Sequence, residues 1–322
     1  MTESQQRLPV FSDVRSAAER ITPYVHRTPV LTSASMNQLT GAKLFFKCEN
    51  FQKVGAFKFR GACNALFSYS SEELRNGVAT HSSGNHAQAV ALAARIREMP
   101  AHIVMPENAP SVKIQAVRSY GADITFCEPT LKAREATLDK ILTQNSAVFI
   151  HPSNDVRVIA GQGTAALEML EDYPDVDCVI APVGGGGLLS GTALAVHGIN
   201  SEMSVFGAEP EGADDAFRSL EAGRLIRPEN PQSVADGLLT SLGDLTFPII
   251  RNHVEQIFTV CDHKIIEAMR LIWERMKIVI EPSAAVPVAV LKQHPEIFSG
   301  KRVGVILSGG NADLDSLPWN NT

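Results

Sequence analysis

Short apolar segments alternate with helix-like segments along most of this chain, and that alternation restricts the folds open to it. Strands that alternate with helices are typical of parallel sheets covered by helices on both faces. The sequence therefore predicts an α/β protein. The predicted strands are 43–48, 78–80, 102–105, 123–127, 148–151, 178–183, 204–209 and 303–307, and the predicted helices are 12–22, 62–69, 86–97, 111–119, 131–144, 191–197 and 265–276.

The chain has 322 residues, which is long enough for two lobes that each bury a core. We expect two open twisted sheets with flanking helices. The large domain would comprise residues 1–75 and 151–322, and a small domain of residues 76–150 would be inserted in it. The longest irregular region is predicted at 211–241.

Charge and cysteine content exclude several classes of protein. The formal net charge of -6, without a basic run, gives no electrostatic case for nucleic-acid binding. The five cysteines lie far apart without a CxxC pair, which argues against a disulfide framework or a zinc site and fits a reducing compartment. No apolar run approaches the roughly 20 residues that span a bilayer, and the N-terminus lacks the shape of a signal peptide. We expect a cytoplasmic protein without membrane contact.

A lysine between apolar residues is the first candidate for a catalytic residue. Lys58 stands between Phe57 and Phe59, and Gly55 and Gly61 frame the segment. Loss of hydration disfavours the charged ammonium group and lowers the pKa of a lysine, which makes the amine a usable nucleophile or Schiff-base partner. On these residues alone, an exposed lysine on an amphipathic segment remains the alternative.

Three loops with glycine follow predicted strands, at the edge where open α/β sheets bind ligands. Residues 82–86 (SSGNH) open a helix, whose free N–H groups suit a substrate carboxylate. Residues 184–187 are four consecutive glycines, and residues 308–311 (SGGN) follow the last predicted strand. An ordinary turn with a serine N-cap is the alternative for the first and third loops.

The four consecutive glycines carry a more specific signal. Their cost in backbone entropy is reasonable where the main chain must approach a phosphate and point several N–H groups at it. They match neither GxGxxG nor GxxxxGK[ST], so an NAD-dependent dehydrogenase and a P-loop protein both lack their fingerprint. A phosphate cradle, a desolvated lysine and a carboxylate loop together specify an aldehyde cofactor that carries a phosphate, namely pyridoxal 5′-phosphate.

Four segments in this order, GAFKFRGA, THSSGNHAQA, PVGGGGLLSG and LSGGNAD, resemble those of the fold-type II pyridoxal-phosphate enzymes. That family has the tryptophan synthase β-like fold, and within it the chain looks most like the serine racemases and the serine/threonine dehydratases. The resemblance covers nearly the whole chain and includes HPSNDVRVIAGQGT at 151–164 and ERMKIVIEPSA at 274–284.

The resemblance implies roles for residues around the cofactor. Lys58 would hold the cofactor as a Schiff base and then act as the base at the substrate Cα. Phe57 would pack against the cofactor ring, Asn85 would bind its 3′-hydroxyl, and Ser308 would face its pyridine nitrogen. The phosphate would be held by Gly184, Gly185, Gly186, Gly187 and the Leu188 N–H.

The resemblance also implies a substrate site. Ser83 matches the position that serves serine racemases as a second base, on the cofactor face opposite the lysine, so the sequence permits racemisation. A plain carboxylate ligand is the alternative for Ser83. Arg134 and Thr240 would reach the distal end of the substrate, where an arginine suits the second carboxylate of 3-hydroxyaspartate. The residues around the substrate carboxylate would be Ser82, Ser83, Asn85 and His86.

Two further sites follow from the same resemblance. The carboxylates of Glu209 and Asp215 and the main-chain carbonyl of Ala213 match a divalent-cation site, and oxygen ligands suit Mg²⁺, Ca²⁺ or Mn²⁺. A solvated acidic loop is the alternative. Tyr120, Lys277 and Asn311 match positions that bind an ATP effector at the dimer interface of animal serine racemases.

The predicted function is a pyridoxal-phosphate-dependent ammonia-lyase that eliminates water from a β-hydroxy amino acid to give a 2-oxo acid and ammonia. Serine is the first substrate choice, threonine is a further one, and serine racemisation is the expected partner activity. A 3-hydroxyaspartate dehydratase is one alternative. A non-catalytic amino-acid sensor on the same scaffold is another, but a sensor could dispense with Lys58 and Ser83. We expect a homodimer.

Overall fold

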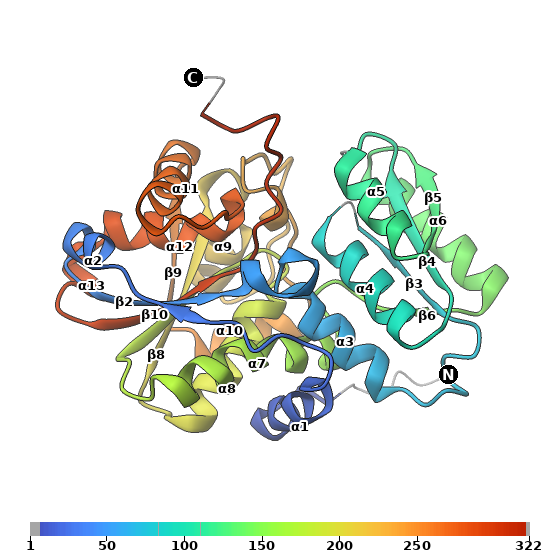
Figure 1. Ribbon diagram of the computed structural model, residues 1–322, viewed down its shortest axis with the longest axis horizontal. Coiled ribbons are helices and arrows are strands. Elements are labelled where there is room, and N and C mark those ends of the chain that lie inside the picture. The colour runs from blue at the N-terminus through green and yellow to red at the C-terminus, as the bar shows by residue number, and fades with distance from the viewer. Residues whose placement is uncertain (1–6, 83, 110, 320–322) are drawn as a thin grey trace.

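The computed structural model describes residues 7–82, 84–109 and 111–319, and its strands form two open sheets (Figure 1). In the larger sheet, the short edge strand β1 is antiparallel to β2 and the other neighbours are parallel. Its strand order is β1 (Val30–Leu31), β2 (Lys43–Cys48), β10 (Arg302–Leu307), β7 (Cys178–Pro182), β8 (Ser204–Pro210) and β9 (Gln256–Val260).

The smaller sheet is entirely parallel. Its order is β5 (Asp123–Cys127), β4 (Ala101–Pro106), β3 (Val78–His81) and β6 (Val148–Phe149). Successive residues of β3 face opposite sides, as the pleat requires: Val78 packs with α4 (Asn85–Ile96) and α5 (Ser111–Ser119), whereas Ala79 packs with α6 (Leu131–Asn145). This sheet is therefore covered by helices on both faces.

Helices also cover both faces of the larger sheet (Figure 1). One face packs against α11 (Asp262–Met276) and α12 (Pro282–Gln293). The other face lies under α7 (Val156–Asp172) and α8 (Gly187–Ile199), with α1 (Phe11–Ile21) and α10 (Thr246–His253) outside them. The remaining helices are α2 (Ala34–Thr40), α3 (Lys58–Ser68), α9 (Asp215–Ala222), α13 (Pro295–Phe298) and the short turns η1 (Glu49–Phe51), η2 (Lys53–Gly55), η3 (Glu211–Ala213) and η4 (Asp236–Leu238).

Glycines bring α3, α7 and α8 into backbone contact. A Cβ on Gly161 of α7 would lie 2.7 Å from the Arg60 carbonyl oxygen of α3. A Cβ on Gly163 of α7 would lie 2.5 Å from the Gly191 carbonyl oxygen of α8. Real Cβ atoms do not approach other atoms this closely, so each position requires glycine and the three helices are held at short spacing.

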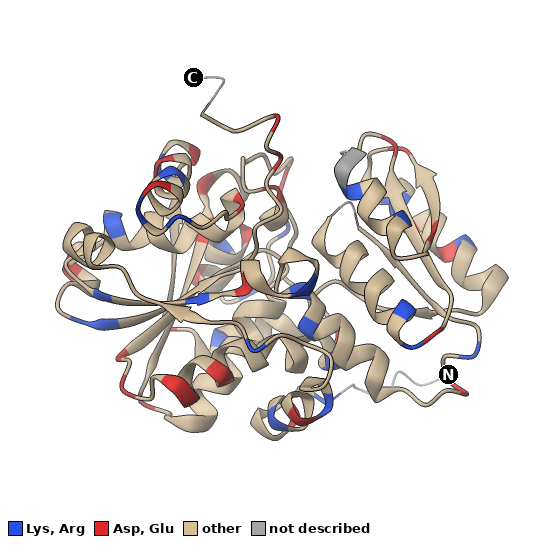
Figure 2. Cartoon of the chain, viewed as in Figure 1, with Lys and Arg blue, Asp and Glu red and all other residues tan. Residues whose placement is uncertain are grey.

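The parallel-sheet architecture predicted from the alternation is confirmed, although α7, α10, α12 and β9 were not among the predicted elements. The predicted helix 62–69 begins earlier, because α3 already starts at Lys58 and tolerates Gly61 at its contact with α7. The region 211–241 is less irregular than predicted, since α9 lies within it. Basic and acidic residues are interspersed over both sheets and their helices (Figure 2). Within the described residues, no helix has the length and apolar character that crossing a membrane requires.

Candidate active site

Lys58 is the first residue of α3, and its side chain is half-buried. Its Nζ donates a hydrogen bond to the Pro152 carbonyl oxygen at 2.8 Å and lies 5.1 Å from the centre of the Phe57 ring. The Phe57 N–H donates to the Ser308 carbonyl oxygen at 3.0 Å, which fixes the start of α3 to the end of β10. The amine is therefore held between the loop after β6 and the carboxyl end of a central strand.

Burial makes the neutral form of this amine more accessible than in a solvated lysine. Burial lowers the pKa of Lys58 to about 8, although the nearby carboxylate of Glu281 acts in the opposite direction. Burial also raises the pKa of Glu281 to about 7, and the charge of Asp236 adds to that rise. The two groups thus form an acid–base pair whose pKa values are drawn toward neutral pH, as is frequent at catalytic sites.

Glu281 anchors a network of side-chain amides. Asn85 Nδ2 donates to Glu281 Oε1 at 2.8 Å, and Asn311 Nδ2 donates to Asn85 Oδ1 at 2.8 Å. The Glu281 N–H donates to the Gly309 carbonyl oxygen at 3.0 Å, beside the buried Ser308. The Asn85 amide retains one N–H and one lone pair for a further partner. We missed Glu281 in the sequence, although a charged residue within the apolar run 278–286 was the available signal.

The four glycines form a tight loop at the start of α8. Gly186 has a φ of 80°, in the left-handed region that favours glycine, and α8 begins at Gly187. A Cβ on Gly184 would lie 2.8 Å from Leu238 Cα, and a Cβ on Gly187 would lie 3.1 Å from Ser153 Cα. The first N–H groups of a helix have no partner within it, so the loop offers main-chain donors at the positive end of the α8 dipole.

These groups fit pyridoxal phosphate. The loop 151–154 joins them, because Pro152 contacts Lys58 while Ser153 packs against Gly185 and Gly187. The loop 151–154 therefore contacts both the half-buried Lys58 amine, whose pKa is lowered, and the glycine loop, where a side chain would clash. When bound, the cofactor supplies an aldehyde that reacts with amines and a ring that withdraws electrons. Its contacts with Phe57, Asn85, Ser308 and Leu188 stay predictions.

Three neutral imidazoles surround the same region. Burial lowers the pKa of His86 well below its ordinary value, and the Lys58 charge adds to this effect. Burial likewise lowers the pKa values of His81 and His151 to about 4. Buried Nδ1 atoms of His81 and His86 have no hydrogen-bond partner among the described residues. Only His86 was predicted; His81 and His151 lie at and just after the carboxyl ends of β3 and β6, which was the signal for them.

The predicted substrate residues approach the site from both sheets. Arg134 on α6 has a buried Nε without a hydrogen-bond partner in the described part of the chain, and its charge adds to the lowered pKa of His81. Thr240 lies beside the glycine loop, where its Oγ1 would be 3.3 Å from a Cβ on Gly185. Ser82 Oγ accepts from the Gly84 N–H at 3.2 Å. Ser83, the predicted second base, lies outside the described residues.

Glu209 and Asp215 are both fully buried at the end of β8 and the start of α9. Glu209 accepts the N–H groups of Ala216 at 2.9 Å and Phe217 at 2.8 Å. Neither carboxylate oxygen of Asp215 has a hydrogen-bond partner among the described residues. Burial raises the pKa of Asp215 to about 6 and that of Glu209 well above its usual value. Two buried carboxylates, of which Asp215 has both oxygens without a partner among the described residues, suit a cation.

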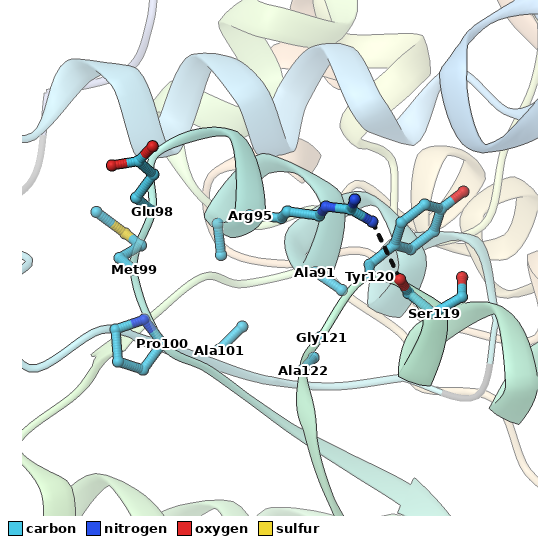
Figure 3. A pocket seen from close by; sticks show the side chains of 11 residues that line it. Ala91, Arg95, Glu98, Met99, Pro100, Ala101, Ser119, Tyr120, Gly121 and Ala122 are labelled. Atoms are coloured by element: carbon cyan, nitrogen blue, oxygen red, sulfur yellow. Dashed lines mark hydrogen bonds between the residues drawn. The ribbon is translucent and has the colours of Figure 1, made fainter.

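The predicted nucleotide residues lie on different elements. Asn311 belongs to the Asn85 network described above, and Lys277 is the C-cap of α11. Tyr120 follows α5 and lines a pocket of about 560 Å³ (Figure 3). In that pocket, Arg95 donates to the Ser119 carbonyl oxygen at 3.1 Å.

Comparison with known proteins places this site in a family. The profile of the family "Pyridoxal-phosphate dependent enzyme" matches residues 21–309. A β-hydroxyaspartate dehydratase of Paracoccus denitrificans (strain Pd 1222) is 53% identical over 97% of this chain and 99% of that protein. A serine racemase of Dictyostelium discoideum is 51% identical over 95% of this chain and 96% of that protein. The structure of maize serine racemase superimposes with a TM-score of 0.94 at 45% identity, covering 98% of this chain and 97% of that one.

The chain belongs to the fold-type II pyridoxal-phosphate-dependent enzymes. Within that class it falls in the serine racemase/dehydratase family, as the four sequence segments predicted. The protein is accordingly an enzyme that uses pyridoxal phosphate and acts on amino acids, and the sensor and the NAD-dependent dehydrogenase are set aside.

Proposed function

We propose that this enzyme eliminates water from a β-hydroxy amino acid, with serine as the leading substrate, and releases a 2-oxo acid and ammonia. The position of Lys58 carries the proposal: its amine is half-buried, is oriented by Pro152 O at 2.8 Å, and lies beside the glycine loop. The serine racemases among its relatives support serine as substrate.

In this proposal, Lys58 transfers the proton and the N-terminus of α4 binds the substrate. Because the pKa of Lys58 is lowered to about 8, a fraction of its amine is neutral at neutral pH and can remove the proton from the substrate Cα. The N-terminus of α4 and its loop would bind the substrate carboxylate. The imidazoles of His81, His86 and His151 have lowered pKa values, so they are weaker bases than the lysine amine and do not compete with it for that proton.

Product formation from a panel of amino acids tests this function. The purified enzyme with pyridoxal phosphate would be incubated with L-serine, D-serine, L-threonine and the isomers of 3-hydroxyaspartate, and release of 2-oxo acid would be measured. Release of pyruvate from L-serine is expected. Failure of every β-hydroxy amino acid in the panel would contradict the proposal.

A second candidate substrate is 3-hydroxyaspartate, and Arg134 favours it. A buried guanidinium nitrogen without a partner is costly unless a ligand supplies one. A substrate with a second carboxylate would pair with that group, whereas serine would not. The β-hydroxyaspartate dehydratase among the relatives supports the same substrate.

Replacing Arg134 by glutamine is expected to separate the two substrates. The kcat/KM for 3-hydroxyaspartate should fall about 10- to 100-fold, which corresponds to the roughly 1.5–3 kcal/mol of a hydrogen bond to a charged group, while that for serine changes little. Lys132→Gln, which removes an exposed charge from the same helix, is the control. Equal losses for both substrates would argue that Arg134 acts on the fold instead.

Replacing Ser83 by alanine tests the proposed racemase activity. If Ser83 exchanges a proton on the face opposite Lys58, interconversion of L-serine and D-serine should vanish while pyruvate release from L-serine continues. Chiral chromatography and a 2-oxo acid assay on the same samples measure the two rates. Parallel loss of both activities would refute the two-base assignment and leave Ser83 as a carboxylate ligand.

We also propose that Glu209, the Ala213 carbonyl and Asp215 bind a divalent cation through oxygen ligands. Among the described residues, no group of three or more acidic, histidine or cysteine side chains could hold a metal ion, so water would complete the shell. Adding Mg²⁺, Ca²⁺ or Mn²⁺ to chelator-treated enzyme should raise its thermal midpoint by about 2–5 °C. Asp215→Asn should abolish the rise, and Asp214→Asn, where Asp214 pairs with Arg218, should keep it. A midpoint insensitive to all three cations would contradict the site.

Four further expectations stay predictions from the sequence: the homodimer, the ATP effector, the cytoplasmic location and the domain boundaries at residues 75/76 and 150/151. Light scattering measures the number of chains in solution, and turnover with and without Mg-ATP tests the effector.

A further inference from the structure

Two histidines meet at the ends of α8 and α10, away from the proposed catalytic groups. Both helices start at the glycine loop, where the Ser190 hydroxyl of α8 donates to the Thr246 carbonyl oxygen of α10 at 3.3 Å. Each carries a histidine in its last turn, and the Nδ1 atoms of His197 and His253 lie 3.0 Å apart. The proposed function uses neither ring.

The hydrogen bonds of the two rings define which nitrogen of each neutral ring carries the proton. His197 Nε2 lies 3.1 Å from the Met203 carbonyl oxygen, which can only accept, so Nε2 carries the proton. In the neutral ring, His197 Nδ1 then presents a lone pair, and His253 Nδ1 must be the donor between the two rings. Burial lowers the pKa of His253, and the proximity of His197 adds to that effect. The lowered pKa favours the neutral form of His253, and a histidine must be neutral to bind a metal ion.

The spacing of the two nitrogens matches that of two ligands on one metal ion. Imidazole nitrogens bind zinc at about 2.0–2.1 Å, so two of them at tetrahedral or right angles are about 2.9–3.3 Å apart. The observed separation of 3.0 Å lies in that range. Histidine ligands commonly donate their other ring N–H to a main-chain carbonyl, and His197 already does so at Met203.

A pocket beside the pair leaves room for the remaining ligands. It has a volume of about 270 Å³, and both histidines line it together with Ser201, Glu202, Asn252 and Glu255. Polar walls and two acidic residues favour a hydrated cation there. Since the described residues contain no set of three metal-ligating side chains, water would fill the other positions.

We infer that His197 and His253 form a binding site for a divalent transition-metal ion such as Zn²⁺, Ni²⁺ or Cu²⁺. On binding, the proton on His253 Nδ1 moves to Nε2 by exchange with solvent, and both Nδ1 lone pairs bind the ion without net proton release. Nitrogen ligands distinguish this site from the oxygen ligands of Glu209 and Asp215, which suit hard cations. The ion would cross-link the far ends of the two helices whose first turns frame the glycine loop.

Metal titration of the holoenzyme tests this inference. After chelator treatment and saturation with Mg²⁺, calorimetric titration with NiCl₂ should give one Ni²⁺ per chain. His197→Gln and His253→Gln should each weaken Ni²⁺ binding by at least about tenfold. The control is His263→Gln, because His263 is an exposed histidine beside Glu267 on α11.

Electron paramagnetic resonance of the Cu²⁺-loaded wild type provides a readout that requires no variant. Coupling to two imidazole nitrogens is expected. Coupling to one nitrogen or none would overturn the inference, as would unchanged Ni²⁺ affinity in His253→Gln, or absence of stoichiometric Ni²⁺ binding. If a glutamine variant fails to fold, the Cu²⁺ spectrum of the wild type alone decides.

Discussion

Lys58→Ala is expected to lower turnover by at least about 10³-fold, because a positioned general base alone contributes roughly 10²–10⁴. The variant should also lose the visible absorbance of protein-linked cofactor at about 410–420 nm. The structure gives the physical reason: the Lys58 amine donates to Pro152, and the neighbouring Ser153 packs against Gly185 of the glycine loop.

A neighbouring lysine provides the matched control. Lys53 lies in η2, with its Nζ 5.7 Å from the centre of the Phe59 ring, and it has no hydrogen bond to the loop after β6 among the described residues. Lys53→Ala should keep both activity and absorbance. An active, yellow Lys58→Ala enzyme would remove the basis for the whole site.

Arg60→Ala should produce the largest loss of stability among single substitutions that leave the site residues in place. The fully buried guanidinium donates to Glu49 Oε2 at 2.7 Å and to Glu168 Oε1 at 2.7 Å. Lys47 balances the charge through a contact of 2.6 Å with Glu168 Oε2. Removing one partner from such a group leaves buried charge without compensation, which costs about 3–5 kcal/mol. Chemical denaturation of the holoenzyme would measure the change.

An exposed ion pair gives the contrast for this prediction. Arg27 contacts Glu171 at 2.8 Å and Asp172 at 2.6 Å, but its side chain is 50% exposed. Arg27→Ala should cost less than about 1 kcal/mol, because solvent screens surface pairs. Similar losses in Arg60→Ala and Arg27→Ala would mean that the buried network contributes no more than a surface pair.

Local patterns in the sequence predicted the architecture, and the apolar neighbours of Lys58 made that residue a candidate for catalysis. The period of the apolar residues indicated the parallel sheets, and the glycine run at 184–187 indicated a close approach of backbone. Partners that are distant in sequence could not be predicted in this way. Arg60 meets Glu168 across 108 positions of sequence, and Asn85 meets Glu281 across 196.

The buried carboxylate of Glu281 illustrates a second limit of sequence reasoning. Its pKa near 7 depends on burial and on Asp236, Asn85 and Lys113, which come from three other elements. The residue type alone gave no reason to expect a carboxyl group of raised pKa beside the lysine. The fold had to be known before the raised pKa of Glu281 could be predicted.

The glycine contacts between α3, α7 and α8 fix the spacing of these three helices. Lys58 begins α3 and the glycine loop begins α8, and α7 holds both helices at backbone distance through Gly161 and Gly163. These contacts thereby limit how far Lys58 and the glycine loop can move relative to each other. Arg134 on α6 and His81 on β3 lie outside these contacts, so substitutions there would leave the spacing of Lys58 and the glycine loop unchanged.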